Sequence, residues 1–395
     1  MRLCLALLLL LPSAPVKTGL EVLVRDGFKP LQGKRVGLVT NHSAIDSSKA
    51  SIIDLMAAGK GFTLTALFSP EHGIRGTEDA NVDSSRDQQT GLPIHSLYGK
   101  TRKPTPEMLR DVDLLVFDIQ DIGTRYYTYS TTLALVMEAA KENDKVVLVL
   151  DRPNAIGGDA VEGPILEESL RGAFIGYFAL PTRHGMTIGE LARLYNTEFK
   201  IGCRLDVVKM EGWTRSMYID DAGVPWVAPS PNMRSLPAAI AYPGIGALEG
   251  TNLSVGRGTF MPFRWYGAPW IDPAAICAEL NGRSLAGVRW KPIRFMPGQP
   301  PGMPAYPHAG KECGGFEVEI VDRRVFRPVA ASLHVLDALY RLYPKDLTFG
   351  RSCGMIGLKS IETDLKAGKS PADIERAWQP DLETFLAARK KALLY

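Results

Sequence analysis

The sequence predicts an α/β fold in which a Rossmann-like, mostly parallel sheet is followed by a second, smaller α+β domain. Three observations carry this prediction. Short apolar runs alternate with segments of helical period through about the first 210 residues, which is the pattern of βαβ units. Beyond about residue 230 the chain becomes rich in Gly, Pro and small polar residues. Its 395 residues are also more than one hydrophobic core usually carries.

The first residues, MRLCLALLLLLPSAPVKTG (1–19), have the pattern of a secretory signal peptide. Arg2 precedes an apolar run over 3–11, and small residues follow. The run is too short to span a bilayer as a stable anchor. We therefore expect a periplasmic or secreted protein without stable membrane insertion. The alternative is a buried N-terminal helix.

The first domain is expected at residues 20–232, as a catalytic domain with five strands. Apolar runs place the strands at 34–41, 62–69, 113–121, 145–154 and 203–210. Helices are expected within 47–59, 105–112, 129–143 and 187–199. Thr187 and Glu190 form a capping box for the last of these. Residues 69–100 read as a long polar loop.

The second domain is expected at residues 233–395, where it completes a cleft with the first. Strands are expected at 287–297 and 314–322, and helices near 328–343 and 371–394. The Gly- and Pro-rich entry segment, which has no clear period, is expected to close over the edge of the first domain.

Composition and missing motifs exclude several function classes. The net charge is only +3 and no basic tract occurs, so no nucleic-acid partner is expected. The first strand-to-helix turn, TNHSAIDSS, lacks the glycines of a dinucleotide site, and no other cofactor motif occurs, so no cofactor is expected. Four cysteines beyond the leader match no zinc motif, and both disulfides and buried free thiols stay open for them.

Polar residues follow each of the first four strands at its carboxyl end, where open α/β sheets bind ligands. They are Asn41 and His42 after the first strand, Glu71 and His72 after the second, Asp118 and Asp121 after the third, and Asp151 after the fourth. We read this edge of the sheet as the site.

Paired carboxylates at this edge fit the cleavage of a glycosidic bond, which needs an acid and a second group. Glu71 lies in the turn FSPEHGIRG, where partial burial suits a general acid, and His72 could orient it. Asp118, Asp121 and Asp151 are possible partners, with Asp151 also a candidate for substrate binding. For Asp151, which precedes Arg152, an ion pair is an equally good interpretation. A metal-dependent hydrolase that uses the same carboxylates is the alternative, although no metal-binding spacing occurs and no metal is assigned.

Arginines and rings gather in two further segments. GTRYYTY supplies Arg125 and Tyr126, and PTRHGMT supplies Arg183 and His184. Aromatic faces suit sugar rings and arginine suits a carboxylate, so these are candidate substrate-binding residues. Packing in the core is the alternative for the tyrosines.

Seven motifs taken in order, GLVTNHSA, LFSPEHGIRG, VFDIQDIGTRYYTY, LDRPNAIGG, PTRHGMTIGELA, SPNMRS and LEGTNLSVGRGT, resemble the bacterial exo-β-N-acetylmuramidase family. The resemblance covers the chain beyond the leader. It implies a periplasmic or secreted glycosidase that releases N-acetylmuramic acid from the non-reducing end of peptidoglycan fragments, with Glu71 as its catalytic glutamate. A muropeptide or disaccharide would be the partner. A non-catalytic peptidoglycan-binding protein is a further alternative.

The same motifs add candidate substrate-binding residues: Arg75, Asn232, Glu249, Asn252 and Arg257. The lactyl carboxylate of muramic acid needs a cation, and the candidates for it are Arg125, Arg183 and Arg257.

Overall fold

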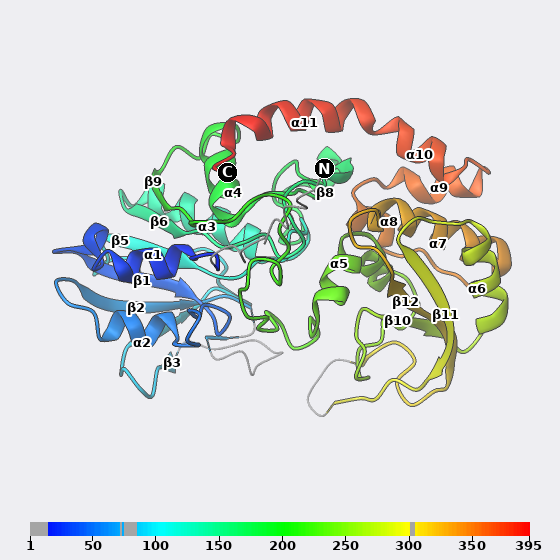
Figure 1. Ribbon diagram of the computed structural model, residues 1–395, viewed down its shortest axis with the longest axis horizontal. Coiled ribbons are helices and arrows are strands. Elements are labelled where there is room, and N and C mark those ends of the chain that lie inside the picture. The colour runs from blue at the N-terminus through cyan, green and yellow to red at the C-terminus, as the bar shows by residue number, and fades with distance from the viewer. Residues whose placement is uncertain (1–14, 72, 75–84, 301–304) are drawn as a thin grey trace, which may run out of the picture.

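The computed structural model describes residues 15–71, 73–74, 85–300 and 305–395. A seven-stranded sheet forms the N-terminal part and a three-stranded sheet the C-terminal part, and the two parts lie side by side (Figure 1). This architecture confirms the expected α/β fold with a second, smaller α+β region.

The larger sheet has the strand order β3-β4-β2-β1-β5-β6-β9. Its strands are β1 Arg35–Thr40, β2 Thr63–Ser69, β3 Ser85–Arg86, β4 Pro93–Ser96, β5 Leu114–Asp118, β6 Val146–Leu150 and β9 Arg204–Val208. All neighbours pair in parallel except β3, which pairs antiparallel to β4. The parallel strands therefore follow the doubly wound order, with the topological switch between β1 and β5.

Helices cover both faces of this sheet, as the near-continuous apolar strands require. Leu38, Leu67 and Val116 pack in one cluster with residues of α1 Gly19–Arg25 and α2 Ile52–Ala57. Their alternating neighbours, such as Val39, Phe68 and Phe117, pack on the other face with α3 Tyr129–Glu142 and α4 Ile188–Thr197. The capping box at the start of α4 is confirmed, with Thr187 and Glu190 bonded reciprocally.

Two local expectations in this part were wrong. Residues 106–111 form turns rather than a helix, because the turn that begins at Thr105 is not continued. The expected loop 69–100 contains β4, which pairs in parallel with β2 through Ile94 and Leu67. Pro93 starts this short strand near the edge of the sheet, where a missing N–H is tolerated.

The C-terminal sheet is antiparallel, with the order β10-β12-β11. Its strands are β10 Trp265–Ala268, β11 Val288–Phe295 and β12 Cys313–Ile320, surrounded by α5 Leu236–Ile245, α6 Pro273–Gly282, α7 Pro328–Leu342, α8 Ser352–Ile356 and α9 Ser360–Lys366. The helix expected at 371–394 is two helices, α10 Pro371–Ala377 and α11 Gln379–Ala392, and Pro380 lies in the first turn of α11. The sequence did not indicate α5, α6, α8, α9 or β10.

The end of the chain returns to the N-terminal part, where α11 runs across the top of both parts to α4 (Figure 1). Arg389 Nη2 donates to the Gly185 carbonyl at 2.7 Å, and the Tyr395 hydroxyl donates to Asp151 Oδ2 at 2.9 Å. The boundary predicted at 232/233 lies in the loop before α5, and the C-terminal residues pack on both sides of it.

Of the expected leader, residues 1–14 lie outside the described residues. Val16 donates its N–H to the Ala222 carbonyl at 3.2 Å, and Thr18 caps α1. Residues 16–19 are therefore packed against the folded first domain.

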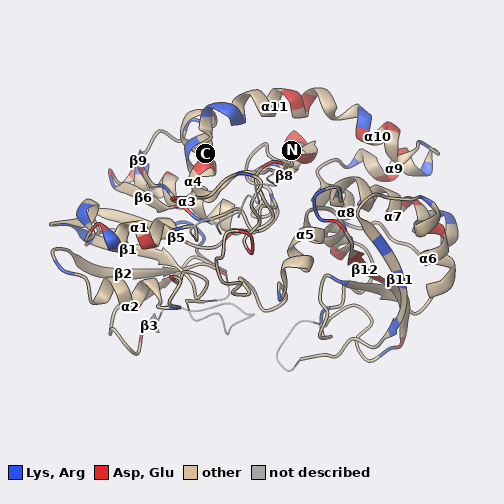
Figure 2. Ribbon diagram, in the orientation of Figure 1, with Lys and Arg blue, Asp and Glu red and all other residues tan. Residues whose placement is uncertain are grey.

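The remaining features of the fold are its distribution of charge, the length of its helices and the state of its cysteines. Lys and Arg are interspersed with Asp and Glu over both parts (Figure 2). No described helix is long and apolar enough to cross a membrane. Cys203, Cys277, Cys313 and Cys353 are buried free thiols.

Candidate active site

A cavity of about 630 Å³, called the cleft below, lies where the two parts meet. Its described lining from the N-terminal part is Glu71, Tyr98, Tyr126, Tyr127, Thr128, Tyr129, Ile175, Ser230 and Asn232. From the C-terminal part it is Met233, Tyr242, Glu249, Arg257, Phe263, Ala305, Tyr306, Pro307, Arg351 and Met355. The cleft thus has a polar, acidic and aromatic surface, which suits a sugar better than an apolar ligand.

Glu71 enters the cleft from the turn that follows β2, and its side chain is half-buried. The Thr128 hydroxyl donates to Glu71 Oε2 at 2.7 Å. Thr128 is the N-cap residue of α3, yet its hydroxyl makes no capping bond to that helix. The carboxyl is therefore oriented by a hydroxyl that the helix leaves free for this contact.

A cluster of aromatic rings forms one wall of the cleft. Tyr242 lies at its centre, with ring centroids 5.1 Å from Tyr126, 6.0 Å from Tyr127 and 4.8 Å from Phe263. Tyr127 meets Tyr129 edge to face at 5.1 Å. Burial raises the pKa of all four tyrosines, so each remains a neutral phenol at physiological pH.

Glu249 and Arg257 face each other across an ion pair of 2.8 Å. The Arg257 guanidinium also lies 5.2 Å from the ring centroid of Phe263. Among the described residues, Glu71 and Glu249 are the two carboxylates that line the cleft. Burial is the main cause that raises the pKa of Tyr242, and the charges of Glu249 and Glu71 raise it further.

Asn41 and His42 do not line the described cleft but connect the end of β1 to the loop that does. Asn41 Nδ2 donates to the Tyr129 hydroxyl at 2.9 Å, and that hydroxyl donates to the Pro229 carbonyl at 2.6 Å. A ring nitrogen of His42 is 2.7 Å from the Ala228 carbonyl. These contacts fix the segment that carries Ser230 into the cleft.

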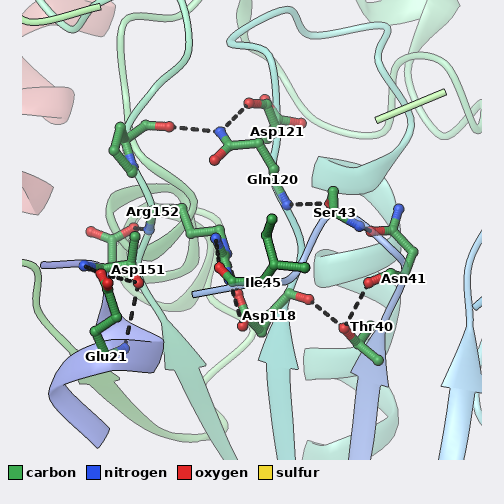
Figure 3. Close-up of polar contacts among 12 residues, drawn as sticks. Glu21, Thr40, Asn41, Ser43, Ile45, Asp118, Gln120, Asp121, Asp151 and Arg152 are labelled. Atoms are coloured by element: carbon green, nitrogen blue, oxygen red, sulfur yellow. Dashed lines mark hydrogen bonds and ion pairs between the residues drawn. The ribbon is translucent and has the colours of Figure 1, made fainter. Parts of the chain in front are cut away.

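Asp118 does not reach the cleft. It is fully buried and forms a two-pronged ion pair with Arg152, in which Arg152 Nη2 lies 2.9 Å from Oδ2 (Figure 3). Arg152 also donates to the Ile45 carbonyl, so the pair fastens the loop after β1 to the ends of β5 and β6. The expected catalytic role of Asp118 finds no support in this geometry, because both its oxygens are engaged within the fold.

Asp121 is buried beside His184, with Oδ1 3.9 Å from His184 Nε2, and both lie outside the cleft lining. The Gly123 N–H donates to Asp121 Oδ1 at 2.7 Å, which closes the turn after β5. Burial raises the pKa of Asp121 to about 7 and lowers that of His184 to about 3. The roles expected for Asp121 and His184 stay predictions, and both side chains are buried in the core rather than in the cleft lining.

Asp151 also faces inward. It accepts from the Gly189 N–H at 2.8 Å, from the Thr187 hydroxyl at 2.7 Å and from Tyr395, and burial raises its pKa to about 7. It joins β6 to the start of α4 and to the last residue of the chain. The strand-end position was predicted, but the side chain serves the fold.

Three further candidates do not line the cleft. Arg183 pairs with buried Glu162 at 2.7 Å. Asn252 bonds the 346–348 segment through the Asp346 carbonyl at 2.8 Å. Arg125 is buried, and its Nη2 donates to the carbonyls of Met355 and Ile356 at 2.7 and 2.9 Å.

The cleft thus contains five of the sequence candidates: Glu71, Tyr126, Asn232, Glu249 and Arg257. His72 and Arg75 lie outside the described residues. The sequence did not point to Tyr98, Tyr242, Tyr306 or Arg351. Tyr242 lies in α5, which the sequence did not indicate, and the other three come from irregular segments far apart in the chain. Within the described part of the chain, no group of three or more His, Cys, Asp or Glu side chains is placed to hold a metal ion.

Comparison with known proteins shows which family the chain matches. Residues 36–237 match the N-terminal domain, and residues 240–395 the C-terminal domain, of the family described as exo-β-N-acetylmuramidase NamZ. The chain is 45% identical over 385 residues to the peptidoglycan β-N-acetylmuramidase NamZ of Bacillus subtilis. The aligned region covers 96% of this chain and 91% of that protein.

Two crystal structures of DUF1343 family proteins from Bacteroides fragilis are similar in fold. One superposes with a TM-score of 0.88 at 37% identity and covers 97% of this chain and 100% of its own. The other superposes with a TM-score of 0.77 at 30% identity and covers 97% and 99%.

Proposed function

Because the chain belongs to the exo-β-N-acetylmuramidase NamZ family, we propose that the cleft is its active site and that Glu71 is the general acid. The chain is a glycoside hydrolase that releases terminal N-acetylmuramic acid from the non-reducing end of peptidoglycan fragments. Membership of this family of enzymes also argues against the alternative of a non-catalytic peptidoglycan-binding protein. A disaccharide or muropeptide ending in N-acetylmuramic acid is the proposed partner.

The pair of cleft carboxylates, Glu71 and Glu249, is the observation that carries this assignment of roles. Glycoside hydrolysis uses one carboxyl group as a proton donor and a second group that acts on the anomeric carbon or on water. Glu71 has a hydroxyl neighbour and no cation within ion-pair distance among the described residues, which suits the protonated partner.

Glu249 suits the ionised partner, because Arg257 is held 2.8 Å from it. In the proposed reaction the proton of Glu71 moves to the glycosidic oxygen while the bond from that oxygen to C1 breaks. The bonding electron pair leaves with the oxygen, and the Glu249 carboxylate stabilises the positive charge that develops at C1. Water then adds to C1 and supplies the oxygen of the hemiacetal product, and the proton that this water releases restores the protonated form of Glu71.

We also propose that the protein is exported. The apolar run over 3–11 supports a leader, and the packing of Val16 and Thr18 supports a cleavage point before residue 16. Mass spectrometry of the mature protein tests this, since an intact N-terminus on a cytoplasmic protein would contradict export.

Glu71→Gln tests the proposed active site. The variant should stay folded and lose roughly 10²- to 10⁴-fold in kcat on a disaccharide of N-acetylmuramic acid and N-acetylglucosamine. The loss should be smaller on a nitrophenyl N-acetylmuramide, whose leaving group needs little protonation. If Glu71 held a metal ion instead, both substrates would lose activity to about the same extent, and a chelator would inactivate the parent enzyme.

A further inference from the structure

A second cavity, of about 390 Å³, adjoins the cleft and shares Ile175, Arg351 and Met355 with it. We call it the side cavity. Its other walls include the apolar side chains of Leu166 and Leu170. The shared residues make it a branch of the active site rather than a separate surface pocket.

Uncompensated positive charge distinguishes the side cavity. Arg125, Arg351 and Lys359 line it, and none of them has an ion pair with a described acidic residue. Its lining acid, Glu362, is already paired with Lys366 at 2.6 Å. Charge complementarity therefore favours an anionic ligand at this place.

The buried position of Arg125 makes its positive charge destabilising when no anion lies beside it. The residue is 2% exposed, its Nη2 reaches only backbone carbonyls, and its Nε has no hydrogen-bond partner. Burial lowers the pKa of Arg125 to about 10, so the guanidinium still carries its charge at neutral pH. A buried cation without an acidic neighbour is destabilising, and a bound anion offsets part of that cost.

Arg351 lies at the junction of the two cavities, and its backbone is fixed to the element that carries Glu249. Its N–H donates to the Gly250 carbonyl at 2.8 Å. A Cβ on Gly250 would come within 2.3 Å of the Ser352 nitrogen, so only glycine permits this approach. The backbone of Arg351 is thus anchored beside the element that carries Glu249, and its exposed side chain lines both cavities.

We propose that the side cavity binds the carboxylate of the lactyl ether of N-acetylmuramic acid, with Arg351 as its direct partner and Arg125 as buried supporting charge. This inference rests on the proposed function, because the lactyl group is what distinguishes a muramide from a glucosaminide. Arg257 is less suited to this role, since Glu249 already neutralises it. Arg183 is paired with Glu162 in the core.

The test compares three nitrophenyl glycosides with the same leaving group: the muramide, its lactyl methyl ester and the glucosaminide. The parent enzyme should prefer the free acid over both others. Arg351→Gln should lower kcat/KM on the free acid by roughly 10- to 100-fold and change it less than about threefold on the ester. The kcat/KM of Arg351→Lys on the free acid should lie between the values of the parent and of Arg351→Gln, because lysine keeps the charge but loses the two-pronged contact.

Arg324→Gln is the matched control, because Arg324 is an exposed arginine outside both cavities. Equal rates on acid and ester, or equal losses on both in Arg351→Gln, would overturn the inference while leaving the muramidase function intact. Equal turnover of a muramide whose lactyl carboxyl is amidated with alanine would overturn it as well. No hydrolysis of any muramide by the parent enzyme would overturn the proposed function itself.

Discussion

The Thr128 hydroxyl donates a 2.7 Å hydrogen bond to Glu71 Oε2, and so joins the N-terminus of α3 to the turn after β2. Threonine at an N-cap position ordinarily accepts from the first turn of its own helix. Here that capping bond is missing. The arrangement gives up some helix stability to orient a carboxyl in the cleft, which is what a positioning residue for a general acid does.

Thr128→Val should therefore reduce catalysis without unfolding the protein. We expect kcat on the disaccharide to fall roughly tenfold, since a hydrogen bond to an ionisable group is lost, with little change in KM. The nitrophenyl muramide should be less affected. Thr132→Val, one turn further along α3 and outside the cleft, is the control and should behave like the parent. Equal losses on both substrates would argue against a role through Glu71.

Asp118→Asn should destabilise the fold rather than remove activity. The substitution leaves the Arg152 guanidinium buried without its counter-ion, which typically costs about 3–5 kcal/mol. Chemical denaturation measures this loss, and kcat per folded molecule should stay near the parent value. The control is Asp144→Asn, which breaks an exposed pair with Arg204 and should cost less than about 1 kcal/mol. A folded but inactive Asp118→Asn enzyme would restore Asp118 as a catalytic candidate.

Asp121→Asn should make the protein relatively more stable at high pH. Burial raises the pKa of Asp121 to about 7, against roughly 3.9 in an unfolded chain. The folded state therefore binds the extra proton between about pH 4 and 7, and the contribution of this group to stability is lost as the pH rises through that window. Asparagine does not titrate, so the free energy of unfolding of the variant, relative to that of the parent, should increase from pH 5 to pH 8.

Denaturation midpoints of both proteins at pH 5 and pH 8 measure this difference. Burial also raises the pKa of Asp151 to about 7. Asp151 is present in both proteins, so its effect on stability cancels in the comparison. A stability difference that does not change between the two pH values would show that Asp121 is ionised in the fold.

The sequence was a good guide to the sheet because its strands are buried on both faces and leave continuous apolar runs, as in β1 and β5. The strand-end rule also led to Glu71. It did not predict the inward direction of the Asp118 and Asp151 side chains, since the rule places a residue at the edge of the sheet but not the direction of its side chain. Parallel strands end in loops whose buried backbone groups need partners. Asp151 accepts directly from the Gly189 N–H, whereas Asp118 holds Arg152, which donates to the Ile45 carbonyl.

Much of the cleft could not be predicted for a different reason. Tyr242 lies in α5, a helix that is apolar on all sides and has no readable period. Arg351 is the N-cap residue of the short helix α8, which Gly250 allows to lie close to the segment that carries Glu249. Such residues converge through tertiary packing, which leaves no local pattern in the sequence.

The last prediction separates the two cleft carboxylates. Glu249→Gln removes the charge that faces Arg257 but leaves Glu71 able to donate its proton. If Glu249 acts on the anomeric centre or on water, its loss should lower kcat by roughly 10²- to 10⁴-fold on the disaccharide and about equally on the nitrophenyl muramide. A better leaving group relieves the need for an acid but not for this second group. Glu71→Gln should instead show a large difference between the two substrates. Measuring both variants on both substrates gives four rates, and the same substrate dependence for the two variants would rule out the division of roles proposed here.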